Sequence, residues 1–532
     1  MPSKRLHRPF PIVRYARCLP AFAVTAVIFS GCGGSDSPQG ALADAAMDMD
    51  GSADAAPEGA PQADGEAGAP MIVCTVVVST LTDLSNALLA PAPGSTICLA
   101  DGTYTDANLA FTAPGTATQP IVITAQNPGR AILAGKTQIS MGGSFVTLQG
   151  LLLKGGQSSG PSLVETKNGT TFCNDCRVTD LAIVDVDIGN AADTKWVSLY
   201  GQRDRVDHCV FSGKTNPGTL LVVWRQLAGR SDDDDIDHNL FANRPPLAVP
   251  ANGNEAIRVG TGAEASSDSN TRIQENLFEA MSGDAEVISV KSGANVIRSN
   301  TITRSVGTLT LRNGKGSTVD ANIILTGGLS GAGGIRVIGP NHRITNNYVE
   351  GVRSSSAARG GLSLVSGMSN PGPGQYAQVV DALVAFNTVV DCDQSLIFGA
   401  DSNPLAPKNV TFANNLIASA RTSVVAPGVG LITPTIFGNL YIGAPLGFSP
   451  GTGFTEIDPM LARAADGLMR PSPGSPAIGV AQAGTDVTTD IDGQTRTGAF
   501  DVGCDQVGAL GPTRGPLTRS NVGPQRWTIT VP

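Results

Sequence analysis

Four residues in one short part of the chain have the types and spacing needed to remove a weakly acidic proton. Lys291 and Arg312 occupy similar segments, GDAEVISVKS and GTLTLRNG, and Asp284 and Glu286 come just before the lysine. A proton beside an ionised carboxylate is hard to remove, because its loss places a second negative charge next to the first. A hard cation held by carboxylate oxygens would neutralise that charge, and a neutral lysine would serve as the base.

Positively charged residues recur at the polar positions of neighbouring strand-like segments. They are Arg258, Lys291, Arg312 and Arg336. Because side chains alternate along a strand, we expect these four to point outward from four consecutive strands. The apolar residues expected to point inward are Ile257, Val259, Val290, Leu311, Ile335 and Val337. Like charges on adjacent strands repel, so the pattern predicts a ladder of cations that binds an anionic ligand.

An asparagine followed by two apolar residues recurs along the body of the chain, with several copies 22 to 25 residues apart. The copies begin at Asn239, Asn276, Asn300, Asn322, Asn347, Asn387, Asn415 and Asn439, and the segment 208–211 resembles an earlier copy. A coil of this length carries about three short strands and stacks on its neighbours as a parallel β-helix. Equivalent asparagines are expected to hydrogen-bond along the stack and to occupy a left-handed turn. The repeat predicts an all-β, single-domain solenoid.

The N-terminal residues differ from the body in composition. Residues 1–32 combine a basic start with a short apolar run that ends in Gly31-Cys32, which is typical of a lipoprotein signal peptide with Cys32 as the lipidated residue. An ordinary secretory signal is the alternative. Residues 33–71 contain eight acidic residues and no basic ones, and we interpret them as a disordered tether. The protein is therefore expected to be exported and lipid-anchored in the outer membrane, at the cell surface or in the periplasm.

The remaining chain is divided into a β-helix domain over residues 72–510 and a C-terminal tail over residues 511–532. The stretch from Asp458 is expected to cap the open end of the stack. The whole chain has a net charge of −9, but the tether holds eight of its acids. The body is thus only mildly acidic, and its local charge pattern says more about a partner than its total charge. We expect a monomer that contacts a membrane only through its lipid, with no nucleic-acid partner.

Nine cysteines are compatible with export. Cys74 and Cys98 are plausible disulfide partners, and the CxxC motif at Cys173 and Cys176 favours a local disulfide or free thiols over zinc, since no second ligand pair is evident. The acidic run 232–235 is interpreted as a solvated turn. Trp224 is the tryptophan best placed to line a sugar site.

Several blocks of this sequence resemble polysaccharide lyase family 6, which comprises chondroitinase B and many alginate lyases. They are NRPPL at 243–247, NGNEAIRVGT at 252–261, residues 286–292, residues 309–314 and GGIR at 333–336. The resemblance covers most of residues 75–505. It implies a right-handed parallel β-helix and calcium-assisted β-elimination of a 4-linked uronic-acid polymer, with an acidic polysaccharide as the partner.

The resemblance also implies roles for individual residues. Lys291 would be the base, and Arg312 the acid or charge stabiliser. The calcium (Ca2+) ligands would be Asp284, Glu286 and Asn252, with Asn254 as the competing asparagine, and the substrate-binding residues would be Arg258, Arg336, His342 and Asn313. This chain departs from the family pattern at Asp284, where glutamate is usual, and at Asn313, where histidine is usual. For His342, a purely structural role in a turn is the alternative.

We therefore predict a polysaccharide lyase, with alginate favoured and dermatan sulfate possible as the substrate. A non-catalytic surface β-helix that binds acidic glycans is one alternative. A pectin-type glycoside hydrolase is the other, although it would need paired carboxylates around the scissile bond rather than a row of cations.

Overall fold

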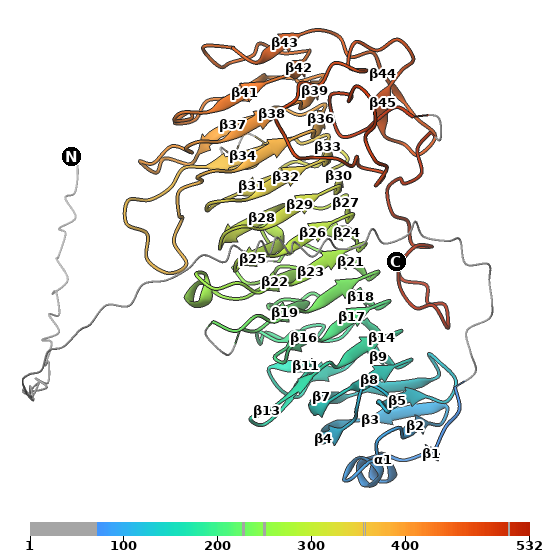
Figure 1. Ribbon diagram of the computed structural model, residues 1–532. Coiled ribbons are helices and arrows are strands. Elements are labelled where there is room, and N and C mark those ends of the chain that lie inside the picture. Colours follow the sequence, from blue (N-terminus) through green and yellow to red (C-terminus); the bar gives the residue numbers. More distant parts are fainter. Residues whose placement is uncertain (1–71, 226–228, 248–251, 355, 357, 509–510) are drawn as a thin grey trace, which may run out of the picture. The chain divides into compact units, whose positions relative to one another are not determined.

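The computed structural model describes residues 72–225, 229–247, 252–354, 356, 358–508 and 511–532. In this part of the chain, short strands follow one another around coils that stack along one axis (Figure 1). The first sheet has 14 strands, from β1 (Val76–Val78) to β41 (Thr435–Phe437), and the third has 14, from β3 (Gly102–Thr105) to β43 (Phe454–Glu456). The second sheet has 15 strands and ends at β40 (Ser423–Ala426). The predicted right-handed parallel β-helix is confirmed.

The N-terminal end of the stack is covered by helix α1 (Leu81–Leu88), which packs against β1, β2 (Thr96–Leu99) and β4 (Asn108–Pro114). The helix begins where the side chain of Thr80 accepts a hydrogen bond from the backbone of Asp83. Leu84 and Leu88 are buried on its inner face. The helix thereby covers the apolar interior at the first coil, which has no preceding coil to pack against.

The interior is one continuous apolar column. All six residues that alternation predicts to point inward are at most 2% exposed: Ile257, Val259, Val290, Leu311, Ile335 and Val337. Further toward the N-terminus, Phe211, Phe241 and Phe278 stack with ring centroids 4.9 Å apart. The spacing of these rings matches the separation of adjacent strands, so each coil contributes the same side chain to the same stack.

A ladder of buried asparagine side chains runs along the stack, as predicted. Each side-chain amide donates to the side-chain oxygen of the next copy at 2.9 to 3.0 Å. The ladder contains Asn239, Asn276, Asn300, Asn322, Asn347, Asn387, Asn415 and Asn439, and Cys209 donates its backbone N–H to the first of them. These bonds pair polar groups that would otherwise be costly to bury.

The expectation that the ladder asparagines occupy the left-handed turn is wrong. The residue before each ladder asparagine does so instead, for example His238, Glu275 and Phe386, with φ of 53°, 55° and 56°. A non-glycine residue in this region costs about 1 kcal/mol or more. The hydrogen bonds of the following asparagine offset that cost at every coil.

At a second corner of the coils, buried aspartate side chains accept hydrogen bonds from backbone N–H groups of the preceding coil. The interpretation of residues 232–235 as a solvated turn is therefore wrong. The backbone N–H of Asp204 donates to Asp234 Oδ1, and that of Cys176 donates to Asp204 Oδ1. Asp232 is also buried and pairs with Arg225 at 2.8 Å. Burial raises the pKa of Asp204 to about 8, and burial together with the charge of Asp204 raises the pKa of Asp234. The Asp204 carboxyl therefore keeps its proton at neutral pH.

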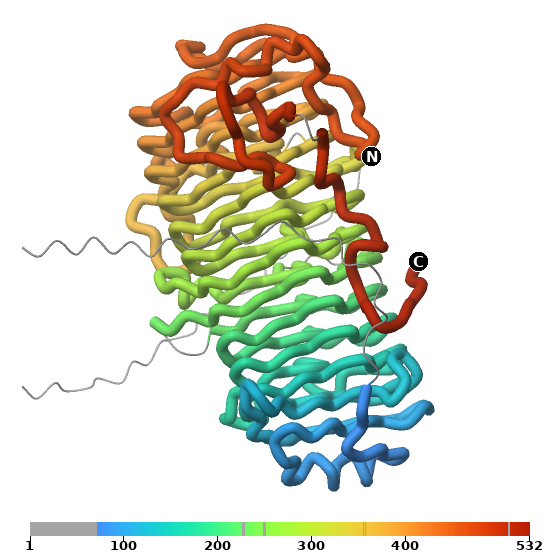
Figure 2. Tube along the Cα trace, turned by 45° about the vertical axis from the view of Figure 1, so that its right-hand side comes forward, coloured from blue at the N-terminus to red at the C-terminus, as the bar shows by residue number. Residues whose placement is uncertain are grey.

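The C-terminal chain covers the outer face of the third sheet, so the expectation that it caps the open end is wrong (Figure 2). The strands of this sheet carry apolar residues on both faces. One outer cluster joins Ile323, Tyr348, Val390, Leu416 and Leu440 to Leu468, Ala477, Ile491 and Val502. A second joins Val210, Leu240 and Leu277 to Trp527, Ile529 and Val531, so residues 511–532 belong to the same packed body.

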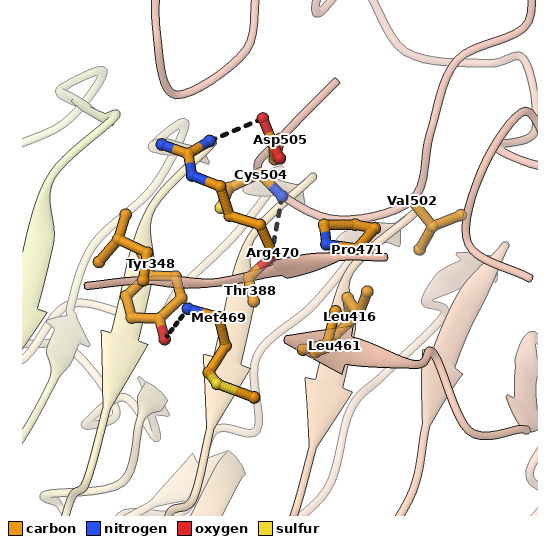
Figure 3. A pocket seen from close by; sticks show the side chains of 11 residues that line it. Tyr348, Thr388, Leu416, Leu461, Met469, Arg470, Pro471, Val502, Cys504 and Asp505 are labelled. Carbon is orange, nitrogen blue, oxygen red and sulfur yellow. Dashed lines mark hydrogen bonds and ion pairs between the residues drawn. The ribbon is translucent and has the colours of Figure 1, made fainter. Parts of the chain in front are cut away.

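The cavity in Figure 3 lies where this segment meets the third sheet, and it is a packing defect of about 10 Å³. Arg470 bridges Asp505 and Asp492 at 2.8 and 2.9 Å, and the Tyr348 hydroxyl accepts from the backbone of Met469. A space of this size holds one water at most. It is therefore no candidate for a sugar site.

The predicted disulfide between Cys74 and Cys98 is present, and the CxxC motif forms a disulfide between Cys173 and Cys176. Among the residues described, no helix is long and apolar enough to cross a membrane. The predicted signal peptide, the lipidation site Cys32 and the whole tether (residues 33–71) lie outside the described residues.

The aspartate pair predicts a specific pH dependence of stability. A carboxyl with a raised pKa holds its proton more tightly in the folded state, so its contribution is full below about pH 4. As the pH rises, the contribution of this carboxyl to the unfolding free energy falls by about 1.4 kcal/mol per pH unit, until the pH reaches the pKa of the carboxyl in the folded state. Asp204→Asn should therefore lessen the decline in unfolding free energy between pH 5 and pH 8, measured by denaturant titration.

Asp233→Asn is the matched control, because Asp233 lies in the same acidic run but is half-buried. It should leave the slope of stability against pH unchanged. An Asp204→Asn protein with the parental slope would show that Asp204 does not titrate in this window.

Candidate active site

The predicted catalytic residues lie on adjacent strands of the second sheet. Lys291 ends β25 (Glu286–Lys291), and Arg312 lies near the end of β28 (Thr308–Asn313). Val290 pairs with Leu311, but Lys291 pairs with Asn313, so Arg312 is an extra residue in its strand. Such a β-bulge changes the direction of a side chain and is common beside active sites. In a regular ladder Arg312 would pair directly with Lys291; the bulge shifts Arg312 out of that pairing, and both side chains remain partly exposed.

The predicted cations do lie on the outer face of the second sheet, but they do not occupy equivalent positions on their strands. Arg258, on β22 (Ile257–Val259), pairs with Ser289, and Arg336, on β31 (Ile335–Val337), pairs with Thr310. The two arginines therefore belong to one row, while Lys291 lies two residues further along its strand. The cations form a staggered group rather than a single column.

Buried carboxylates lie among these cations. Glu255 Oε1 is 3.3 Å from Lys291 Nζ, and Glu286 Oε1 is 3.8 Å from Arg312 Nε and 3.4 Å from Arg336. Burial raises the pKa of Glu286, and nearby Glu255 raises it further. Two neighbouring carboxylates in one buried site repel each other, and positive charge between or around them lowers that cost.

A cleft of about 530 Å³ opens beside this group, and three arginines line it: Arg312, Arg336 and Arg359. Tyr376, from the loop after β34 (Leu362–Val365), also lines it, with its ring centroid 4.2 Å from Arg312 and 5.1 Å from Arg336. The Tyr376 hydroxyl accepts from Arg336 at 2.9 Å. Burial and nearby Arg336 lower the pKa of Arg359. These three arginines outnumber the two acids that line the cleft, Asp284 and Glu286, and the cleft suits a carboxylate ligand.

The two competing asparagines have different surroundings. Asn252 lines the cleft, whereas Asn254 is buried and its side-chain oxygen accepts from the backbone of Gly218. Asp284 also lines the cleft, and its carboxylate accepts from the backbone N–H groups of Gly253 and Asn254. The loop that carries Asn252 is thereby attached to Asp284.

Two predicted substrate-binding residues do not face the cleft. His342 is fully buried: its Nδ1 accepts from the backbone of Ser317, its Nε2 bonds the carbonyl of Ile338, and burial lowers its pKa to about 4. Its role is therefore in the turn. Asn313 is buried and donates to the carbonyl of Gln375, so it holds the loop that supplies Tyr376.

The donor set suits a hard cation. Asp284, Glu286 and Asn252 offer oxygen ligands at the cleft, and Glu255 Oε2 is buried with no hydrogen-bond partner among the described residues. The described acids that come closest together as a trio are instead Asp490, Asp492 and Asp505. Arg470 already neutralises two members of that cluster.

The sequence did not reveal the roles of Glu255, Arg359 and Tyr376. Glu255 stands within the block 252–261, but its pairing with Lys291 depends on which strands are neighbours. Arg359 and Tyr376 come from stretches outside the repeat. No periodic pattern marks such residues, so only the three-dimensional structure brings them to the cleft.

Known proteins resemble this chain in sequence and in fold. A family model described as chondroitinase B matches residues 78–427. The structure of the PL6 family alginate lyase AlyGC is similar, with a TM-score of 0.73 and 30% sequence identity, over 86% of this chain and 59% of that one. A mannuronic acid specific polysaccharide family 6 lyase from human gut microbiota gives a TM-score of 0.63 and 28% identity, over 72% of this chain and 90% of its own. No curated protein matches the chain.

A parallel β-helix with an arginine-lined cleft on one sheet defines a class of proteins that bind anionic ligands. The family match extends over more than half of the residues, so the chain belongs to polysaccharide lyase family 6, the chondroitinase B family. It spans only 59% of the length of AlyGC.

Tyr376 is predicted to hold Arg312 and Arg336 in position for an anionic ligand. Its two cation–π contacts are each worth about 0.5–1 kcal/mol, so Tyr376→Ala should weaken the binding of a uronate oligosaccharide about tenfold. Tyr376→Phe keeps the ring and should lose much less. Calorimetric titration of both variants checks this, and equal losses would assign the effect to the hydroxyl instead.

Proposed function

We propose that this protein is a polysaccharide lyase that cleaves 4-linked uronic-acid polymers by β-elimination. The observation that carries the proposal is the incomplete pairing of the site cations. Their contacts with Glu255 and Glu286 measure 3.3 to 3.8 Å, and Arg336 also contacts Asp401 at 3.2 Å, whereas charge-assisted hydrogen bonds are about 2.7–2.9 Å. Arg312 Nη1 and Arg336 Nε are also buried without a hydrogen-bond partner among the described residues. A substrate carboxylate would complete these interactions.

Each residue then has a role in the elimination. Lys291 Nζ takes the proton from C5, the C4–O bond breaks, a C4=C5 double bond forms, and the leaving oxygen takes a proton from the protonated Lys291 or from water. Arg312 stabilises the negative charge that develops. Arg336 and Arg359 bind the uronate carboxylate, since arginine remains charged throughout. Glu255 positions the lysine.

Calcium is part of this proposal. Asp284, Glu286 and Asn252 would hold it, and the bound ion would neutralise the carboxylate next to the reacting carbon. The aspartate in place of the usual glutamate gives a shorter ligand. The arginines that surround Glu286 already supply part of the same neutralisation.

Alginate is the substrate we favour, with dermatan sulfate as the alternative. The similar structures of AlyGC and of the gut-microbiota enzyme are those of an alginate lyase and a mannuronic acid specific lyase. We also propose that the protein is exported and anchored by a lipid on Cys32, as its N-terminal composition indicates.

A non-catalytic glycan-binding protein is the second candidate, and one observation favours it. The side chain of Lys291 is only 14% exposed and pairs with Glu255, and it is absent from the residues that line the cleft. A lysine held in this pair would help to bind polymer without removing a proton. Comparing turnover with binding separates the two candidates.

Lys291→Ala should lower kcat on alginate about 10³-fold, because a general base contributes about 10²–10⁴, while oligosaccharide affinity should change little. Turnover is followed by the ultraviolet absorbance of the new double bond. Lys408→Ala, an exposed lysine outside the cleft, is the matched control. A Lys291→Ala protein as active as the parent would rule out Lys291 as the base, and an inactive parent that binds polymer would support the second candidate.

Removal of calcium by a chelator should abolish turnover, and added calcium should restore it. Asp284→Asn, which removes one ligand charge, should raise the calcium concentration needed for half-maximal activity, as measured by a calcium titration of the initial rate. Full activity of the parent in excess chelator would show that the arginines alone neutralise the substrate.

A further inference from the structure

A row of aromatic side chains continues from Lys291 across the second sheet toward the N-terminal coils. Leu199, at the end of β16 (Lys195–Leu199), pairs with Val223 of β19 (Leu221–Val223). Val223 pairs with Val259, and Val259 pairs with Val290. The residues that follow these four occupy one line across the strands: Tyr200, Trp224, Gly260 and Lys291.

The rings in this row are parallel and half-buried. Tyr200 and Trp224 have centroids 6.1 Å apart with 14° between their planes, and Phe172 continues the series 6.4 Å beyond Tyr200. Trp224 Nε1 donates to Ser198 Oγ at 3.1 Å, which fixes the indole. The row is therefore a fixed apolar surface rather than a set of loosely attached side chains.

Two cations contact this row, and neither forms an ion pair with any described residue. Lys167 Nζ lies 3.7 Å from the centroid of the Tyr200 ring, and the Arg258 guanidinium lies 5.1 Å from that of Trp224. Arg258 Nε is also buried with no hydrogen-bond partner among the residues described. An aromatic face beside a cation without a counter-ion suits a ligand that offers both a flat apolar face and a carboxylate.

The surroundings of the cleft favour a ligand that extends in this direction. Toward the C-terminal coils, Tyr376 packs on the outer cluster of Ile338, Val365 and Ile397, so the loop that carries it covers that part of the sheet. Toward the N-terminal coils, Lys291 and Tyr200 are three strands apart, about 14 Å at about 4.8 Å per strand. A short oligosaccharide spans that distance.

We propose that Lys167, Tyr200, Trp224 and Arg258 form a remote binding platform for the uronate polymer, which extends the active-site cleft along the solenoid axis. The proposal rests on the proposed function, since it takes the ligand to be the same polymer. It implies that the protein prefers long chains, because sugars several units away from the cleaved bond add binding energy.

Binding to an inactivated protein tests the platform. Lys291→Ala protein is titrated with uronate oligosaccharides of increasing length by calorimetry, alone and combined with Tyr200→Ala or Trp224→Ala. Affinity should rise with length in the parent, and each second substitution should weaken the binding of long oligosaccharides about tenfold while that of the shortest changes less than twofold. Trp224→Phe should retain most of the affinity, and unchanged thermal unfolding should show that each variant is folded.

The outcomes distinguish the two proposals. If affinity rises with length but the aromatic substitutions do not change it, the platform alone is overturned. The same conclusion follows if affinity does not vary with length. Failure of every oligosaccharide to bind overturns the proposed function as well. Binding should also change the fluorescence of Trp224 in the parent, and Trp224→Phe should remove that change.

Discussion

The alignment of each coil with the next is the constraint on which the rest of this structure depends. Every strand must pair its backbone with the strands of the coils before and after it, because unpaired polar groups inside the stack are costly. The asparagine ladder fixes that alignment at one corner, and the buried aspartates at a second corner contribute hydrogen bonds of the same kind. A slip of one residue would turn the apolar interior outward.

The active site uses this alignment and departs from it at one point. Arg258 and Arg336 lie in the regular row, and their positions follow directly from strand pairing. A regular ladder would pair Arg312 with Lys291, but the bulge displaces it from that position, and its Nε lies 3.8 Å from Glu286. Like charges directly opposite each other on adjacent strands repel, so the bulge lowers the repulsion between Lys291 and Arg312.

The sequence revealed those features that repeat or that depend on alternation within one strand. The asparagine copies, the inward residues and the outward face of Lys291 were predictable, since each depends on local spacing. The bulge was not, because it is a relation between two strands. Tyr376 and Arg359 lie outside the repeat, and the burial of His342 depends on how its turn packs. The placement of the C-terminal chain was misjudged, since its apolar residues fit a side of the stack as well as an end.

Among the described residues, the C-terminal chain covers the outer face of the third sheet but not that of the second, and this difference explains why the second sheet carries the site. The third sheet has apolar residues on its outer face and needs the C-terminal chain to bury them. Around the cleft and the aromatic row, the second sheet instead presents arginines, lysines and fixed rings that the described chain does not cover. Such a surface contributes little to stability, and its cations are incompletely paired. Under the proposed function, a long anionic ligand parallel to the solenoid axis would match the shape and charge of this surface.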